Sequence, residues 1–433
     1  MRKNFWLIVS VFVIGFFLIS ADSGFSAFMK WETLPNAPVS NSRMDDLFFV
    51  SPTTGWIISS YCDAGCFGDI WKTTDGGNSW TLQITVDHYL RSIGFFDSLT
   101  GFAGTVFADS TETLYGTTDG GANWTVVSNI PSPRPQGVCG ISIVDDTVMY
   151  ASGRFFGPPR VIKTTNRGAS WSSQDLSSLM GSLVDCYFYA PDSGFVVGST
   201  SPDYDTGHPR VLFTSNGGSS WNIRHTGSRT GELCWKLHFI SPSIGYISLE
   251  KFSSGNTYYL KTTNGGINWN DQLFLNFPYD IQGIGFVDEK IGWLGGWGGD
   301  TYETNDSGAS WHLAGFGQIV NRIRFVNDTL GYAVGETVYK YSPCPGAGDA
   351  NASGNINLSD IIANVNYIFN KPGFPSCPAG NQLCWLTGLL CRGDWSGEGS
   401  STLADVIQGV NYLFNKPGGP WNATASGTCC NEQ

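Results

Sequence analysis

One eight-residue phrase recurs along most of this 433-residue chain and limits its fold more than any other feature. It first reads Thr-Thr-Asp-Gly-Gly-Asn-Ser-Trp over residues 73–80, and looser copies follow it. The copies lie 42 to 50 residues apart and end at Trp80, Trp124, Trp171, Trp221, Trp269 and Trp311. A repeat period of this length predicts structural units that stack or close into a ring.

A second repeated element precedes the phrase and consists of an apolar run, a polar turn, a glycine and an aromatic residue. It runs from Leu47 to Trp56 in the first unit and from Phe325 to Tyr332 in the last. There are seven copies of this element but only six of the phrase. Each unit therefore predicts four short antiparallel strands, lettered A to D in chain order, which together form a propeller blade.

The missing seventh phrase predicts how the ring closes. The last unit ends with a segment that matches strand C, residues 338–342, and the chain then leaves the repeat. Residues 29–34 resemble the strand that follows the phrase in the other units. We therefore expect this N-terminal strand to complete the last blade, which removes an exposed strand edge. The predicted fold is mainly β, a seven-bladed propeller over residues 28–342.

The phrase resembles the Asp-box, or BNR, repeat that is shared by sialidases, sortilin-type propellers and the photosystem II assembly factor family. The resemblance implies a propeller fold, and we assign the phrase a structural role. Its Asp or Asn can hydrogen-bond the backbone two residues on, its glycines allow positive φ, and its tryptophan packs into the blade. These structural residues are Asp75, Trp80, Asp119, Trp124, Asn166, Trp171, Asn216, Trp221, Asn264, Trp269, Asp306 and Trp311.

A different duplication begins after residue 343. Each half has a polar twelve-residue loop and an apolar, helix-like run, and both halves end in Asn-Lys-Pro-Gly. Oxygen-bearing side chains at loop positions 1, 3, 5 and 12, with glycine at position 6, form the EF-hand calcium pattern. The predicted calcium ligands are Asp349, Asn351, Ser353, Asn355, Asn357 and Asp360 in the first loop, and Asp394, Ser396, Glu398, Ser400, Thr402 and Asp405 in the second.

Two such loops, each followed by one helix, resemble the type I dockerin domain. The resemblance implies two Ca²⁺ ions and a cohesin-like partner bound by the helix starts around Leu358 and Leu403. The linker between the halves departs from compact dockerins, because it carries Cys377, Cys384 and Cys391. Polar turns before two amphipathic helices, with no metal, are the alternative. A domain this small has little core of its own, which favours calcium.

The N-terminus predicts export. A basic start precedes an apolar run over residues 5–21, which is typical of a signal peptide, here residues 1–27. An uncleaved membrane anchor is the alternative. The remaining chain divides into the propeller (28–342), a dockerin-like calcium-binding domain (343–421) and a Cys-containing tail (422–433). We expect a secreted or cell-surface protein, without membrane insertion after signal cleavage.

The net charge limits the classes of partner that the chain can bind, and the positions of the cysteines indicate which of them form a disulfide. The formal net charge of −12 argues against nucleic acid and anionic membrane surfaces, because little positive charge is available to neutralise phosphates. Exported cysteines can form disulfides, and Cys62 and Cys66 bracket one short loop as a local pair. Cys139, Cys186 and Cys234 lie in or beside apolar segments and are candidates for buried free thiols.

Two classes of function compete for the propeller. The first is a non-catalytic protein that binds protein or glycan and is tethered through its calcium-dependent tail. The second is a glycoside hydrolase of sialidase or Asp-box type acting on extracellular polysaccharide. Sialidases clamp a carboxylate with three arginines, whereas the arginines on or near first strands here, Arg43, Arg91, Arg322 and Arg324, stand singly or in an unrelated spacing. We therefore assign no catalytic residue and favour the binding protein.

Blade topology predicts where a ligand binds. The turns between strands A and B and between C and D share one face, and they are uniform. The loops between B and C and between D and A share the opposite face, and they vary. Variable loops on a rigid scaffold are where ligand contacts usually lie. Trp297, isolated among glycines within residues 295–300, is the candidate ligand-binding residue, and packing between blades is the alternative.

Overall fold

The computed structural model describes residues 29–38, 42–106, 111–251, 254–343, 348–350, 356–369, 371, 385–386, 392–395, 400–414 and 416. The contacts within the chain separate it into two compact units, one of which is Met29–Pro343, and each unit is described by itself. The predicted signal peptide, the Cys-containing tail and the linker cysteines lie outside the described residues. Within the described part of the chain, no helix has the length and apolar character needed to cross a membrane.

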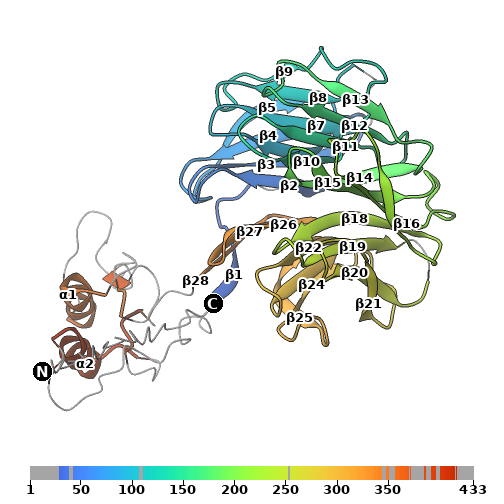
Figure 1. Cartoon of the computed structure of the whole chain (residues 1–433). Coiled ribbons are helices and arrows are strands. Elements are labelled where there is room, and N and C mark those ends of the chain that lie inside the picture. Colours follow the sequence, from blue (N-terminus) through green and yellow to red (C-terminus); the bar gives the residue numbers. More distant parts are fainter. Residues whose placement is uncertain are drawn as a thin grey trace, which may run out of the picture. The chain divides into compact units, whose positions relative to one another are not determined.

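The first unit contains seven four-stranded antiparallel sheets, which confirms the predicted propeller (Figure 1). Blade 1 consists of β2 (Arg43–Phe49), β3 (Gly55–Cys62), β4 (Cys66–Thr73) and β5 (Thr81–Val86). Blade 2 consists of β6 (Tyr89–Phe95), β7 (Gly101–Val106), β8 (Leu114–Thr117) and β9 (Thr125–Val126). Blade 3 consists of β10 (Gly140–Ile143), β11 (Met149–Gly153), β12 (Arg160–Thr164) and β13 (Ser172–Asp175). Blade 4 consists of β14 (Ser182–Ala190), β15 (Ser193–Ser199), β16 (Pro209–Thr214) and β17 (Asn222–Thr226). Blade 5 consists of β18 (Glu232–Phe239), β19 (Gly245–Lys251), β20 (Thr257–Thr262) and β21 (Asn270–Leu275). Blade 6 consists of β22 (Ile281–Phe286), β23 (Gly292–Gly296), β24 (Gly299–Thr304) and β25 (His312–Gln318). Blade 7 combines β26 (Arg322–Asn327), β27 (Leu330–Val334) and β28 (Val338–Pro343) with β1 (Met29–Thr33).

The first strand of the chain closes the ring, as predicted. Strand β1 pairs antiparallel with β28, so that Trp31 lies opposite Tyr341. The order of this sheet is β1-β28-β27-β26, and its outermost strand therefore comes from the other end of the repeat domain. The closure covers the edge that β28 would otherwise expose.

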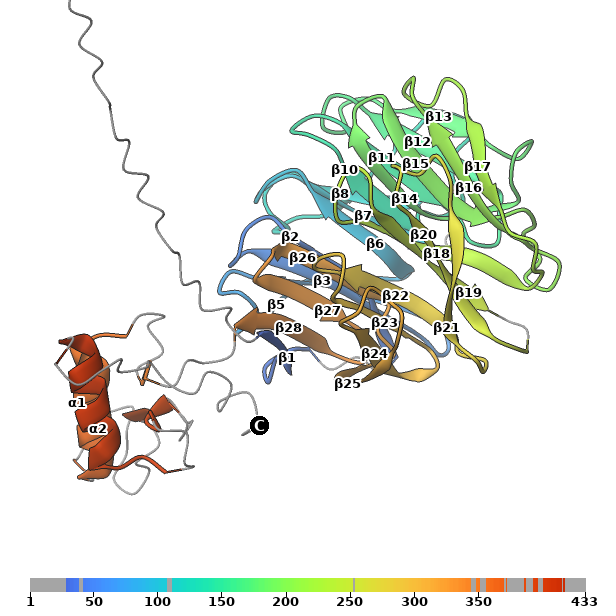
Figure 2. The same cartoon turned by 60° about the horizontal axis from the view of Figure 1, so that its bottom comes forward.

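The blades follow one another around a ring, which Figures 1 and 2 show from two directions. Each inner strand, strand A, contacts the inner strand of the next blade, and β2 contacts β26 across the closure. The inner strands therefore surround the ring centre. We call the face with the A–B and C–D turns the turn face, and the face with the B–C and D–A loops the loop face.

Stacked aromatic rings join neighbouring blades and explain the second repeated element. The ring of Phe95, at the end of strand A, stacks 3.5 Å from the ring of Trp56 in the preceding blade. Across the closure, Phe49 stacks 3.7 Å from Tyr332 in the same way. Gly101 follows the A–B turn, and a Cβ atom there would lie 2.3 Å from Phe95. The glycine of the element is therefore required because an aromatic ring lies directly over it.

The described cysteines follow the sequence prediction. Cys62 and Cys66 form a disulfide that closes the B–C hairpin of blade 1. Cys139, Cys186 and Cys234 are free and buried. Burial raises the pKa of each of these three thiols, so they remain protonated packing groups.

The second unit contains two helices, α1 (Leu358–Ile368) and α2 (Leu403–Leu413), as the duplicated sequence predicts. Both begin with a capping box, in which the N-cap side chain and the side chain three residues on satisfy each other's backbone amides. The helices approach closely at Gly409, where a Cβ atom would lie 2.3 Å from the side chain of Ile361.

Candidate functional site

A pocket opens at the ring centre on the loop face. Its volume is about 220 Å³. B–C loops of blades 3, 4 and 6 supply part of its wall, and inner strands of several blades supply its floor. We call it the loop-face pocket; its lining residues are Arg43, Tyr89, Arg91, Val106, Phe155, Tyr204, Trp235, Glu250, Gln282 and Trp297.

Trp297, the residue selected from the sequence, lies at this pocket. It sits in the two-residue turn between β23 and β24, and 45% of its surface is exposed. The guanidinium carbon of buried Arg43 lies 4.3 Å from the centroid of its ring, which is cation–π geometry. One face of the indole is therefore held by a buried cation while the side chain remains open to solvent.

Two other aromatic residues come from B–C loops that are distant in sequence. Phe155 and Tyr204 stack with their rings nearly parallel and 6.1 Å apart. Phe155 also contacts Trp235, whose ring lies 5.8 Å away. The Nε1 atom of Trp235 donates a 2.8 Å hydrogen bond to Oδ1 of Asn321, which fixes the indole. The wall of the pocket is therefore a preformed aromatic surface.

The floor of the pocket is built by irregularities in the inner strands. In blades 1, 2, 5 and 6 the pairing of strand A with strand B shifts register near its start. The residues skipped by these shifts include Asp45, Arg91, Trp235 and Gln282. A β-bulge bends a strand and re-aims a side chain. Here the bulges turn polar and aromatic side chains toward the ring centre. In a regular strand, the alternation of side chains would place them on the opposite face.

Buried ion pairs hold the floor in place. Arg43 donates a 2.9 Å hydrogen bond from Nε to Oδ1 of Asp45, and Arg91 forms an ion pair with the same oxygen. Arg43 also donates to Oε1 of Gln282, whose amide donates a 2.5 Å hydrogen bond to Glu250. Two guanidinium groups thus share one carboxylate. Among the described residues, the Nε and Nη2 atoms of Arg91 have no hydrogen-bond partner.

Glu250 and Asp280 form a pair of acidic groups beside this floor. Burial raises the pKa of Glu250, and the charge of Asp280 raises it further. Burial also raises the pKa of Asp280. Raised carboxyl pKa values are a feature of catalytic acids. However, Oε2 of Glu250 and Oδ1 of Asp280 are both inaccessible to solvent, so the pair does not present these oxygens to a substrate.

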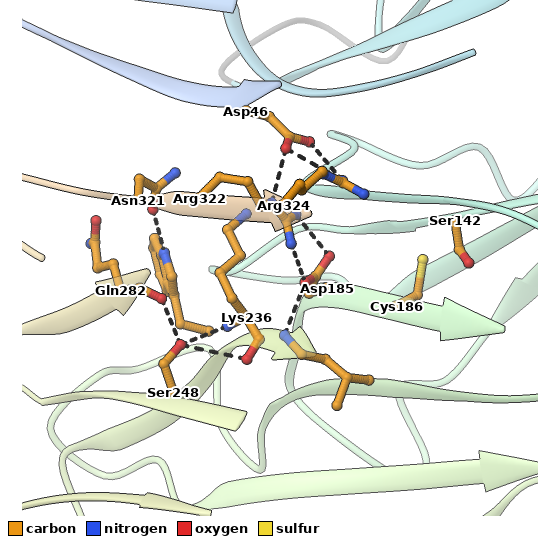
Figure 3. Close-up of polar contacts among 12 residues, drawn as sticks. Asp46, Ser142, Asp185, Cys186, Lys236, Ser248, Gln282, Asn321, Arg322 and Arg324 are labelled. Atoms are coloured by element: carbon orange, nitrogen blue, oxygen red, sulfur yellow. Dashed lines mark hydrogen bonds and ion pairs between the residues drawn. The ribbon is translucent and has the colours of Figure 1, made fainter. Parts of the chain in front are cut away.

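Below the pocket, a second buried cluster spans the ring centre (Figure 3). Arg322 donates from Nε to Asp46 at 2.9 Å and from Nη1 to Asp185 at 2.9 Å, so it bridges blades 1, 4 and 7. These two carboxylates also accept backbone amides, and their Arg322 contacts favour the charged form. Burial raises both pKa values, but Arg322, the other neighbouring cations and the hydrogen bonds together outweigh it, so both pKa values are lowered. The cluster ties distant blades together.

The Asp-box residues lie on the turn face, away from the loop-face pocket. In the first copy, Asp75 Oδ1 accepts a 2.9 Å hydrogen bond from the amide of Ser79, four residues on rather than the two predicted. The Thr73 hydroxyl accepts the amide of Gly77 at 2.9 Å. Both glycines have positive φ, which folds the turn tightly enough for this reach. The indole of Trp80 packs edge-on against Phe49, with centroids 6.4 Å apart.

The same geometry recurs in the other copies. The turn residue accepts the amide four residues on in each of Asp119, Asn166, Asn216, Asn264 and Asp306. The tryptophans that pack edge-on against a phenylalanine are Trp124, Trp171, Trp221, Trp269 and Trp311. Six matching contacts favour a structural role for the phrase.

The predicted calcium loops are described only in part. Asn351, Ser353, Asn355, Ser396 and Glu398 lie outside the described residues. Among those described, no group of three or more His, Cys, Asp or Glu side chains is placed to hold a metal ion. Asn357 and Thr402 are the helix N-caps, and Asp360 and Asp405, three residues after them, are buried. Asp394, at the start of the second loop, is also buried.

Sequence reasoning found Trp297 but missed most of the pocket around it. Phe155 and Tyr204 lie in loops that the variability argument did identify, and the available signal was the Phe155-Phe156 pair in one loop and Tyr204 in the other. Arg91 and Trp235 had no comparable signal, because a one-residue bulge leaves no mark in a short apolar strand. Their side chains face the pocket only after the bulges form.

Comparisons with known proteins identify the fold and no family. No protein-family model matches this chain, and no curated protein matches its sequence. Solved structures do match. YCF48 bound to D1 peptide aligns with a TM-score of 0.53 and 17% identity, over 72% of this chain and 96% of that one. YCF48 from Cyanidioschyzon merolae aligns with a TM-score of 0.54 and 17% identity, over 72% and 99%.

A propeller of another repeat class also aligns. The WD40 repeats of RRP9 match with a TM-score of 0.50 and 10% identity, over 72% of this chain and 97% of that one. Each match spans about the length of the propeller unit. At these identities the likeness is one of fold, and it agrees with the seven sheets of the chain.

Proposed function

We propose that the propeller is a non-catalytic binding module that anchors a protein segment in its loop-face pocket. The observation that carries the proposal is the exposed Trp297, held against buried Arg43 at the mouth of a preformed aromatic pocket. Exposed aromatic residues with a fixed orientation are typical anchors of protein interfaces. At about 220 Å³ the pocket suits one side chain or one sugar ring of a larger ligand.

A protein ligand fits this pocket better than an extended glycan. The pocket lining combines aromatic rings with the polar side chains of Arg43, Tyr204 and Gln282, and this mixture suits a polar side chain of a protein ligand. The peptide bound to YCF48 supports the idea that a propeller of this fold can take a protein ligand. A glycan stacked on Trp297 remains the second outcome of the test.

The propeller proposal is tested by screening the full chain against peptide and glycan arrays. Each bound ligand is then measured with Trp297→Ala and with Tyr189→Ala, an exposed aromatic outside the pocket lining. We expect the first substitution to weaken a peptide ligand about tenfold or more, and the second to leave its affinity unchanged. Ligands whose affinity is unchanged by Trp297→Ala contradict the proposal. Binding of glycans and of no peptide would show that the ligand is a glycan.

We also propose that the C-terminal unit is a dockerin-like module that binds two Ca²⁺ ions. The donors predicted for both loops are oxygen atoms only, and Asp360, Asp394 and Asp405 are buried carboxylates at the loop ends. Hard oxygen ligands of this kind suit Ca²⁺. Bound calcium would compensate the buried negative charge and link each loop to the helix that follows it.

The calcium proposal is tested by substitutions that separate metal binding from helix capping. Asp405 accepts the backbone amide of Thr402 at 2.7 Å, and an asparagine oxygen can accept the same bond. Asp405→Asn should therefore keep the cap but weaken calcium binding, as measured by titration calorimetry. Asp405→Ala should lose both. Absence of calcium-dependent heat and of any EGTA effect on the thermal unfolding of the full chain would contradict the proposal.

A cohesin-like partner is proposed for this module. Each helix exposes a matching apolar pair one turn apart, Leu358 with Ile362 and Leu403 with Ile407, and every one of these side chains is more than half exposed. Exposed apolar side chains in a duplicated arrangement are typical of an interaction surface. Replacing both pairs with serine should abolish calcium-dependent capture of a cohesin by the full chain. Undiminished capture by the quadruple variant, or no capture by the native chain, contradicts the proposal.

Export to the medium or the cell surface belongs to the same proposal. The basic and apolar N-terminus and the disulfide between Cys62 and Cys66 support it. Fractionation of expressing cells, with N-terminal sequencing of the exported chain, tests it. A chain retained inside the cell with its N-terminus intact would contradict it.

The alternative function is a glycoside hydrolase of Asp-box type. The observation that favours it is the pair of acidic groups with raised pKa values beside the loop-face pocket, Glu250 and Asp280. A panel of glycoside substrates tests this directly. Turnover that Glu250→Gln abolishes would replace the binding proposal with the hydrolase.

A further inference from the structure

The ring centre has a second opening, on the turn face. A pocket of about 430 Å³ lies there, within the range typical of small-molecule sites. It is bounded by the ends of inner strands β2, β14, β18, β22 and β26. We call it the turn-face pocket. It is separate from the loop-face pocket, with which it shares no lining residue.

The pocket combines an aromatic wall with a cationic floor. The half-buried residues Phe48 and Phe325 lie in its lining, together with Arg322 and Arg324. Arg324 lies two residues after Arg322 on β26, so both side chains face the ring centre. The side chain of Arg324 is 28% exposed, whereas that of Arg322 is 6% exposed. Arg324 is therefore the cation that a ligand in the pocket can reach.

The carboxylates near this floor already accept hydrogen bonds from arginines and backbone amides. Asp185 accepts both Nη atoms of Arg322, at 2.9 and 3.2 Å, and the amide of Leu237 at 3.1 Å. Asp46 accepts Arg322 Nε at 2.9 Å, and the amides of Leu47 and Ile93. Arg324 reaches Asp46 only at 3.3 Å through Nη2. Its Nε atom is buried and has no hydrogen-bond partner among the described residues.

Lys236 adds a buried amine to the same cluster. It is 1% exposed, and its Nζ atom also has no hydrogen-bond partner within the described part of the chain. Its side chain points across the ring centre toward Arg322 (Figure 3). Arg322 and Arg324 balance the two carboxylates of Asp46 and Asp185. Burial and the neighbouring Arg322 lower the pKa of Lys236 to about 7, so near neutral pH its amine adds only part of a positive charge. Buried charge without a partner is costly, so an anion bound beside Arg324 would offset this partial charge and favour the protonated form of Lys236.

The other polar groups of the lining do not cancel this charge. His238 donates from Nε2 to the carbonyl of Phe286 at 2.8 Å, and burial lowers its pKa to about 4, so it is neutral at physiological pH. Asp328 lies at the rim and is exposed to solvent. Exposed charges are strongly screened, whereas buried ones are screened much less.

We propose that the turn-face pocket binds a small organic anion, a carboxylate joined to an apolar body. The carboxylate would accept charge-assisted hydrogen bonds from the guanidinium of Arg324. The apolar body would pack against the phenylalanine rings of the wall. This site is independent of the proposed loop-face function, because it lies on the opposite face and uses different side chains.

The experiment is titration calorimetry of the full chain with phenylacetate, with phenylacetamide as the uncharged analogue of the same shape. We expect saturable binding of the acid near neutral pH, weakening as salt is added, and at least about tenfold weaker binding of the amide. Equal binding of acid and amide, or no binding of the acid by the folded native chain, overturns the proposal. This comparison needs no substitution, so it stands even if a variant fails to fold.

Substitutions then locate the site. Arg324→Gln should weaken phenylacetate at least about tenfold, and Arg324→Lys, which keeps the charge but loses the planar fork, should weaken it less. Arg224→Gln is the matched control, because Arg224 lines a neighbouring apolar pocket and lies over the ring of Phe213. It should leave the affinity unchanged. A folded Arg324→Gln variant with native affinity overturns the assignment.

Discussion

Trp31 in the first strand lies opposite Tyr341 in the last, with ring centroids 5.2 Å apart. The indole also stacks 4.7 Å from Phe316 and packs edge-on against Trp293, both in blade 6. One side chain from the N-terminal strand therefore joins the last two blades. Trp31→Ala should lower the free energy of unfolding by about 3 kcal/mol, measured by urea unfolding of the full chain.

The matched control for this closure is Trp297→Ala, which also removes an indole. Trp297 is 45% exposed and lies outside the aromatic cluster at the closure. Its removal should change the free energy of unfolding by less than about 1 kcal/mol. Equal effects of the two substitutions would show that the closure has no special weight in stability.

The Asp-box turns predict a specific acid sensitivity. Hydrogen bonds from Ser79, Asn123 and Ser310 lower the pKa values of Asp75, Asp119 and Asp306 to about 2. A carboxyl whose folded pKa is depressed contributes stability above its unfolded pKa and loses it as the pH falls through the folded one. The propeller should therefore lose stability between about pH 4 and pH 2.

The chain itself supplies the control for this effect. Asn166 occupies the same turn position as Asp75, and its Oδ1 accepts the amide of Ser170 at 2.8 Å. Replacing all three aspartates with asparagine should therefore keep the turns but flatten the acid limb of a stability–pH curve from urea unfolding. An unchanged acid limb would assign the sensitivity to other carboxylates.

The glycine beneath each stacked phenylalanine predicts a steric limit. A Cβ at Gly101 would lie 2.3 Å from the ring of Phe95, which is itself stacked on Trp56. Gly101→Ala should therefore destabilise the propeller by about 1–3 kcal/mol through overpacking. Gly65→Ala is the control, because its Cβ would lie 3.5 Å or more from Phe67. Equal melting temperatures for the two variants would contradict this account.

The sequence predicted the fold because the repeat encodes it redundantly. The period of the eight-residue phrase and the seven copies of the second repeated element together specified the number of blades. The last unit, which has no copy of the phrase, identified β1 as the closing strand. Of the residues that line the loop-face pocket, the sequence selected only Trp297 as a ligand-binding candidate. The positions of Arg91 and Trp235 depend on bulges, and the partners of Arg322 come from blades far away in sequence. Neither a bulge nor a contact across the ring leaves a local pattern.

The buried Glu250 predicts that the propeller also loses stability as the pH rises, whereas the Asp-box turns lose stability as the pH falls. Burial and the charge of Asp280 raise the pKa of Glu250 above its ordinary range, so the folded chain holds a proton that the unfolded chain releases. Stability is then greatest below the ordinary glutamate pKa and declines as the pH rises toward the folded value. Glu250→Gln resembles the protonated acid and can still accept the hydrogen bond from Gln282. This substitution should therefore raise the free energy of unfolding at neutral and higher pH, as measured by urea unfolding across that range. Glu289→Gln, at an exposed position, should change little. A Glu250→Gln variant that loses stability above neutral pH as steeply as the native chain would show that Glu250 is ionised in the folded protein, held by Arg43 and Arg91.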